Sequence, residues 1–174
     1  MSPDIDKPSR LLFAIAEALR SAGLGLKVGG RQDFDGTFDQ AWVLIAIERN
    51  APGERAHDGR IAHVLTLSLQ VIVSPTLDDP GVAACDLAAV LKGWVTDKRW
   101  GLSGSQCDLP MNIDALPSTL ISGSQEYLAW TLSFTQTIYL GALLLEDPLG
   151  IPKFAKTWEV SNIDDPDQYT ALEG

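Results

Sequence analysis

The chain has 174 residues and a mass of 18.8 kDa, which suits one domain of ordinary size with its own hydrophobic core. Hydrophobic residues make up 45% of the chain and charged residues 21%, a composition that excludes an intrinsically disordered protein. The sequence predicts no transmembrane helix and no secretory signal. Two cysteines, Cys85 and Cys107, are too few for a disulfide framework and favour a reducing compartment.

The formal net charge is −10, and most of it lies in the second part of the chain. Residues 61–174 carry five basic and fourteen acidic side chains. An acidic surface repels phosphate groups, so we expect neither sequence-specific nucleic-acid binding nor binding to an anionic membrane. An acidic wall along which DNA passes without being retained stays compatible with this charge.

The first element is an expected helix over residues 8–22. Pro8 suits the first helical turn, and apolar residues recur after it at three- and four-residue spacing. Gly23 is typical of a helix end. The stretch 28–39 is rich in Gly and Asp and is expected to be a connector.

Two strands are expected next, over residues 38–48 and 61–73, and an antiparallel hairpin is their simplest pairing. The first strand is apolar on both faces, with Trp42 on one of them. This pattern indicates burial on both sides or a sheet face that serves as an interface. Trp42 is therefore a candidate interface residue.

A second helix is expected over residues 82–98, with Asp79 as its N-cap. Residues 112–122 are weakly strand-like, and Pro117 restricts them to an edge or a break. Residues 126–140 alternate between apolar and polar side chains, which is typical of a half-buried strand.

The expected fold class is thus α+β. A mostly antiparallel four-stranded sheet, in the chain order α-β-β-α-β-β, packs two helices on one face. Residues 1–141 form this domain, and residues 142–174 form an acidic C-terminal extension. In the extension, 154–160 could make one more strand and 162–174 is expected to be exposed.

The chain is poor in catalytic signatures. His57 lies in a polar loop and His63 on a strand, where it is expected to be a buried, hydrogen-bonded side chain rather than a base. These histidines and the two cysteines lack the paired spacing of a zinc site. No catalytic residue, cofactor or metal is therefore expected.

The extension contains a second set of candidate interface residues, namely Phe154, Trp158 and Val160. An aromatic side chain between apolar neighbours in an appendage suits an anchor in the groove of a partner protein. Packing of Trp158 back on its own domain is an equally good interpretation.

The order of elements and the closing strand 127–141, which ends in Tyr139-Leu140-Gly141, resemble a known family. The chain is similar over residues 8–141 to the tail terminator proteins of long-tailed phages, especially those of Mu-like prophages and R-type pyocins. The corresponding pieces are 9–22, 38–73, 79–98 and 127–141. The extension departs from the shorter members of the family.

The resemblance implies a structural protein without catalysis. Such proteins form a homohexameric ring on the last ring of the tail tube, and of the sheath in contractile tails. They end polymerisation and offer a surface to the head–tail connector protein. The implied partners are other copies of the chain, the tube protein, the connector protein and the sheath protein. The implied location is the virion tail, assembled in the cytoplasm of the bacterial host.

Two other functions stay open. One is another neck or tail-completion protein of the same particle. The other is a soluble enzyme or ligand-binding α+β domain with a site assembled from scattered polar residues.

Overall fold

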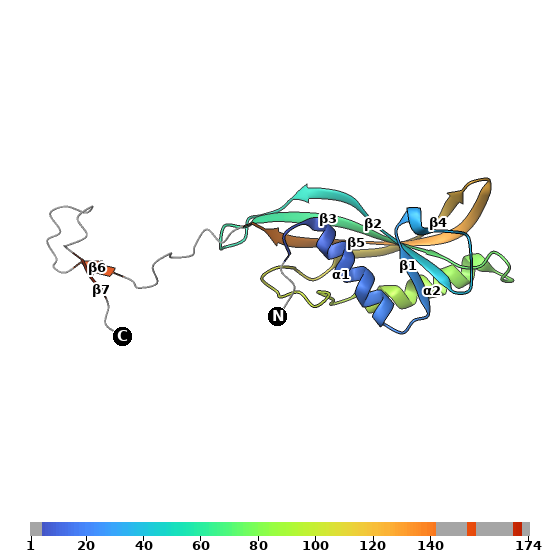
Figure 1. Cartoon of the computed structure of the whole chain (residues 1–174), viewed down its shortest axis with the longest axis horizontal. Coiled ribbons are helices and arrows are strands. Elements are labelled where there is room, and N and C mark those ends of the chain that lie inside the picture. Colours follow the sequence, from blue (N-terminus) through green and yellow to red (C-terminus); the bar gives the residue numbers. More distant parts are fainter. Residues whose placement is uncertain (1–4, 142–152, 156–168, 172–174) are drawn as a thin grey trace. The chain divides into compact units, whose positions relative to one another are not determined.

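The computed structural model describes residues 5–141, 153–155 and 169–171. Residues 5–141 contain two helices and a five-stranded mixed sheet (Figure 1). The strands lie in the order β1-β2-β3-β5-β4; β1 is parallel to β2, and the other neighbouring pairs in this sheet are antiparallel. The α+β class and the two helices are confirmed, whereas the predicted four-stranded sheet and its order of elements are wrong in detail.

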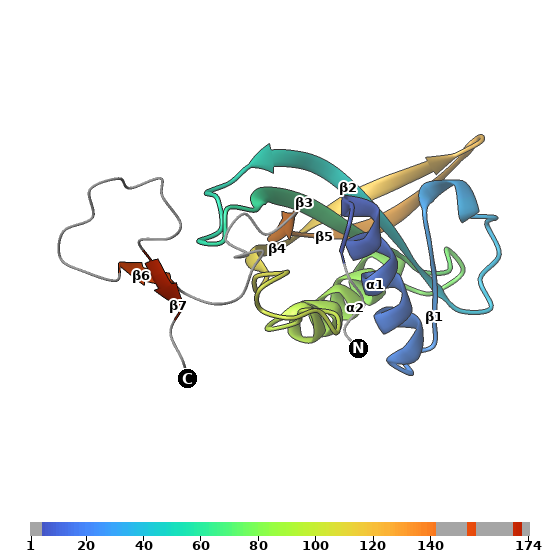
Figure 2. The same ribbon diagram turned by 60° about the vertical axis from the view of Figure 1, so that its left-hand side comes forward.

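Helices α1 (Pro8–Ser21) and α2 (Pro80–Val95) bury apolar residues in one shared core on the same face of the sheet (Figure 2). Each helix begins with proline, whose missing N–H and fixed φ suit the first turn. Asp79 accepts a hydrogen bond from the Val82 amide at 3.1 Å, so the expected N-cap is confirmed. The helix α2 ends earlier than predicted, and Asp97 beyond it has a left-handed φ of 62°.

The main core lies between the helices and the central strands β2 (Ala41–Pro52), β3 (Ile61–Ile72) and β5 (Gln125–Leu140). The antiparallel register sets Leu67 of β3 between Ile47 and Phe134 on neighbouring strands. Because alternate residues of a strand share a face, one side of β3 is almost entirely aliphatic. Its fully buried residues include Leu65, Leu67, Leu69 and Val71.

The strand β1 (Leu26–Gly29) lies partly within residues 28–39, for which the sequence predicts a connector. It pairs in parallel with residues 41–44 of β2, and a short 3-10 helix, η1 (Arg31–Asp33), follows it. The prediction of an irregular connector over 28–39 is therefore wrong at its start. Four residues between glycines are too few for a period-two pattern to become visible.

The edge strand β4 (Met111–Ser122) pairs only with β5 in the described sheet. Pro117 can occupy this edge because no outer strand needs its missing amide hydrogen, as predicted. The β4–β5 hairpin closes through a two-residue turn in which Gly123 has φ 62°, a conformation that glycine adopts without strain.

The chain divides into two compact units, Met1–Ala142 and Leu143–Gly174. In the second unit, the described backbone consists of β6 (Lys153–Ala155) and β7 (Tyr169–Ala171), which pair antiparallel. The predicted strand over 154–160 is described only at its start, and residues 156–160 lie outside the described residues.

Candidate functional site

Of the predicted interface residues, the structure describes the side chain of Trp42 and only the backbone of Phe154. Trp42 is only 6% exposed, because side chains of its own chain cover it. Phe154 lies in β6, and its side chain is outside the described set. Trp158 and Val160 lie outside the described residues, so their assignment stays a prediction. Any interface on the described domain must use residues other than the Trp42 ring.

Trp42 belongs to an aromatic cluster on the sheet face opposite the helices. Its ring lies 5.5 Å from Phe34, and Phe34 lies 5.8 Å from Phe38 and 5.3 Å from Tyr127, all in edge-to-face geometry. Such pairs add about 0.5–1.5 kcal/mol each beyond burial. The cluster closes a second, smaller core with Leu44, Ile72, Leu120 and Ala129. The two-sided apolar pattern of β2 thus reflects burial on both faces.

The loop that covers Trp42 is tied down by polar contacts. Lys27 Nζ lies 5.2 Å from the Trp42 ring, donates to Thr37 Oγ1 at 2.8 Å and forms an ion pair with Asp39. The hydrogen bond from Lys27 lowers the pKa of the Asp39 carboxyl. Trp42 Nε1 donates to the Thr37 carbonyl oxygen at 2.8 Å. These contacts make the loop a fixed lid of the second core.

Buried Gln136 organises the loop that follows α2. Its Nε2 donates to the carbonyl oxygens of Lys98 at 3.0 Å and Asp108 at 2.8 Å, and its Oε1 accepts from Trp100 Nε1 at 2.7 Å. Trp100 has a left-handed φ of 57°, which costs about 1–3 kcal/mol for a residue other than glycine. The hydrogen bond to Gln136 and tilted ring contacts with Trp94 and Phe134 hold it there.

Two titratable groups beside Gln136 are poor nucleophiles. Burial raises the pKa of the Cys107 thiol from 9.0 to about 12. Tyr139 donates its hydroxyl hydrogen to Asp108 Oδ2 at 2.8 Å, and this bond raises the pKa of the phenol. At neutral pH both groups keep their protons, so they act as parts of the fold.

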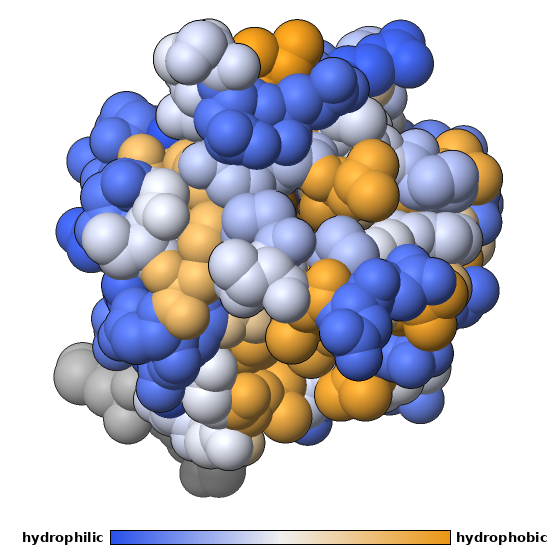
Figure 3. Space-filling model, turned by 90° about the vertical axis from the view of Figure 1, so that its right-hand side faces the viewer, coloured by the Kyte–Doolittle hydropathy of each residue, from blue (hydrophilic) through white to orange (hydrophobic). Residues whose placement is uncertain are grey.

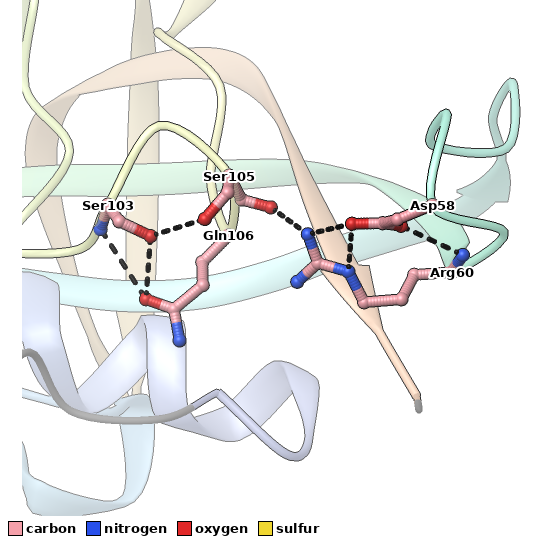
Figure 4. A network of polar contacts seen from close by, with 5 residues as sticks. All are labelled: Asp58, Arg60, Ser103, Ser105 and Gln106. Carbon is pink, nitrogen blue, oxygen red and sulfur yellow. Dashed lines mark hydrogen bonds and ion pairs between the residues drawn. The ribbon is translucent and has the colours of Figure 1, made fainter. Parts of the chain in front are cut away.

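A second polar network joins the β2–β3 loop to the same segment (Figure 4). Arg60 Nη2 contacts Asp58 Oδ2 at 2.7 Å and donates to the Ser105 carbonyl oxygen at 2.5 Å. The hydrogen bond from Arg60 lowers the pKa of Asp58. The hydroxyl groups of Ser103 and Ser105 lie 2.9 Å apart, and Ser103 Oγ donates to Gln106 Oε1 at 3.1 Å. A serine that donates to an amide lacks the general base of a nucleophilic site.

These anchors shape one wall of an apolar groove of about 540 Å³. The other wall is one face of α1, where Phe13, Ala14 and Ala18 recur at helical spacing. Trp100 and Leu102 line the groove from the anchored loop. Phe13 is 61% exposed although it is large and apolar. We call this feature the α1 groove.

A second exposed apolar surface lies where the β4–β5 hairpin meets the start of α2. Ile121 pairs with Glu126 and Leu128 with Thr119, so Ile121 and Leu128 are diagonal neighbours on one face. A Cβ added at Gly81 of α2 would lie 3.8 Å from Leu128 Cδ1. Figure 3 looks onto this end of the domain and shows hydrophobic residues among hydrophilic ones. We call this surface the hairpin patch; it carries the exposed residues Ile121 and Leu128, and the exposed residues Leu77 and Val82 stand close to Gly81 in the sequence.

Among the described residues, no group of three or more His, Cys, Asp and Glu side chains could hold a metal ion. His63 Nδ1 lies 3.1 Å from the side-chain amide of Asn50, and His57 is exposed in the loop that joins β2 to β3. In the part of the chain that is described, no helix is long and apolar enough to cross a membrane.

Comparison with known proteins found no family model that matches the chain and no curated protein that matches it.

Neither the α1 groove nor the hairpin patch was predicted from the sequence. Phe13 lies off the apolar stripe of the predicted helix. A large aromatic residue on an expected solvent-facing side of a helix is a sequence signal that could have indicated the α1 groove. The hairpin patch depends on three separate segments, and its residues come together only through the register of β4 with β5.

Proposed function

We propose that this chain is a structural protein of a phage tail or a phage-tail-like particle. Six copies form a ring that caps the tail tube, ends its polymerisation and presents the surface to which the head connector binds. The resemblance of residues 8–141 to tail terminator proteins is the reason for this choice. The protein does its work through surfaces, with no catalytic step.

The observation that carries the proposal is the presence of two separate exposed apolar surfaces on one small domain. Most monomeric domains expose large apolar residues singly, whereas gathered ones mark sites of association. The α1 groove and the hairpin patch use different elements, as a subunit with two neighbours requires. The net charge of −10 also suits a ring through which DNA must pass without sticking.

The size of the α1 groove favours one competing function, a soluble ligand-binding domain. Its volume of about 540 Å³ falls within the range of ~300–1,000 Å³ that small-molecule pockets occupy. A ligand-binding protein would show a rise in melting temperature with a small apolar molecule while its mass stays that of a monomer. A tail protein would show no rise in melting temperature with such a molecule, and its mass would be that of a multimer.

A gene deletion tests the proposed function directly. The gene is removed from the phage or prophage genome that carries it, and the particles that this genome then produces are inspected. We expect tails of irregular and excessive length that fail to join heads, because nothing stops tube growth. Expression of the full chain from a plasmid is the control and restores normal tails. Tails of normal, uniform length in the deletion strain would contradict the proposal.

A further inference from the structure

The two exposed apolar surfaces differ in shape as well as in position. The α1 groove is concave, and the wall formed by α1 carries the small side chains Ala14 and Ala18. The hairpin patch is formed by exposed aliphatic side chains at a hairpin and at a helix start, among them Ile121, which is 61% exposed. A concave apolar surface and a set of exposed aliphatic side chains are suitable halves of one interface core.

The charges around the two surfaces are also complementary. Near the α1 groove, residues 5–21 carry three basic side chains and two acidic ones, although acidic residues predominate in the whole chain. The acidic partners are held only in exposed ion pairs, Arg10 with Asp6 and Arg20 with Glu17. Exposed pairs of this kind are weak, so Arg10, which lines the groove together with Glu17, stays available to a partner. Arg20 also donates to the Val28 carbonyl oxygen at 3.0 Å and lines a different pocket.

The hairpin patch has the opposite balance. Asp78 and Glu126 are exposed beside it, and Asp79 caps α2 at its margin. Arg31 also lies there and donates to the Ile121 carbonyl oxygen at 3.3 Å, which leaves acidic groups in excess. Opposite charges at the rims of two surfaces guide their encounter and fix their orientation.

We propose that the hairpin patch of one copy inserts into the α1 groove of the next copy, in a head-to-tail contact. This inference rests on the proposed function and names the subunit contact of the ring. A surface that binds a different surface of an identical copy leaves one of each free at the ends, and such contacts close into a ring when the rotation permits. The occupant of the α1 groove is thus a second copy of this chain.

Three glutamate substitutions test the contact. They are comparable because Phe13, Ile121 and Leu116 are each 61% exposed. Phe13→Glu places a carboxylate in the groove, and Ile121→Glu places one in the hairpin patch. Burying a charge in an apolar contact is costly, so each variant should lose the multimer and have the mass of a single chain. Leu116→Glu is the matched control, since Leu116 pairs with Thr131 away from both surfaces, and it should assemble like the unchanged chain.

Mixing the two defective variants gives the decisive result. The Phe13→Glu copy keeps an intact hairpin patch, and the Ile121→Glu copy keeps an intact α1 groove. We therefore expect the mixture to form dimers, visible by native mass spectrometry, although neither variant assembles alone. The two altered surfaces carry like charges and do not join, so growth stops at two copies.

The outcomes separate this inference from the proposed function. If the unchanged chain forms a multimer and the Phe13 and Ile121 variants form it too, the head-to-tail contact is wrong while the ring stands. A groove that serves a small apolar ligand would give this result. A mixture that stays monomeric also overturns the contact. An unchanged chain that is monomeric at all concentrations, with or without tail tubes, contradicts both.

Discussion

At the scale of single residues, Gln136 holds together the loop after α2 and thereby one wall of the α1 groove. We expect Gln136→Leu to lower the free energy of unfolding by about 2–4 kcal/mol, because it strips partners from the Trp100 indole N–H and two carbonyl oxygens. Denaturant unfolding measures this loss. Gln40→Leu, at an exposed position, is the control and should change stability by less than about 0.5 kcal/mol. Equal stability of the two variants would contradict this role of Gln136.

Cys107 makes the stability of the folded protein depend on pH. Its folded pKa of about 12 lies above the ordinary value of 9.0, so its contribution to stability is complete below about pH 9. That contribution is lost as the pH rises from about 9 towards 12, since the unfolded chain then releases the thiol proton more readily. We expect Cys107→Ala to reduce the alkaline loss of stability in denaturant titrations between pH 7 and pH 11.

Thiol labelling of the folded protein is an independent check on Cys107. Half-buried Cys85 should react with iodoacetamide at pH 8, and fully buried Cys107 should react only after unfolding. Rapid labelling of Cys107 in the folded chain would show that its site is open.

At the scale of elements, the N-cap of α2 fixes the start of a helix that borders the hairpin patch. Asp79→Ala removes the acceptor of the Val82 amide and should lower stability by about 1 kcal/mol, or roughly 2–4 °C in melting temperature. Asp78→Ala removes the same charge one position earlier and is the matched control. Thermal unfolding by circular dichroism compares the two variants, and identical shifts would mean that charge alone is responsible.

The elements also show which parts of the fold a sequence can predict. The long alternating run of β5 and the apolar stripe of α1 were predicted to within one residue or two, because many positions repeat one pattern. β1 was not predicted, because its four residues form a strand only through pairing with residues 41–44 of β2. Burial of Trp42 came from aromatic residues of a loop, and no local periodicity encodes that contact.

At the scale of the whole molecule, the net charge of −10 should govern behaviour towards DNA. We expect no retardation of duplex DNA in a gel at low ionic strength, where any electrostatic attraction would be strongest. Binding that weakens with added salt would reveal a basic surface and contradict the passive channel that we propose.

The central claim is that identical copies of this chain close around a hole. The most direct measurement is the native mass of the full chain over a range of concentrations, with negative-stain images of the same sample. We expect a species of about six times the 18.8 kDa chain mass that appears as rings. A strictly monomeric mass at every concentration, unchanged in the presence of tail tubes, would contradict it.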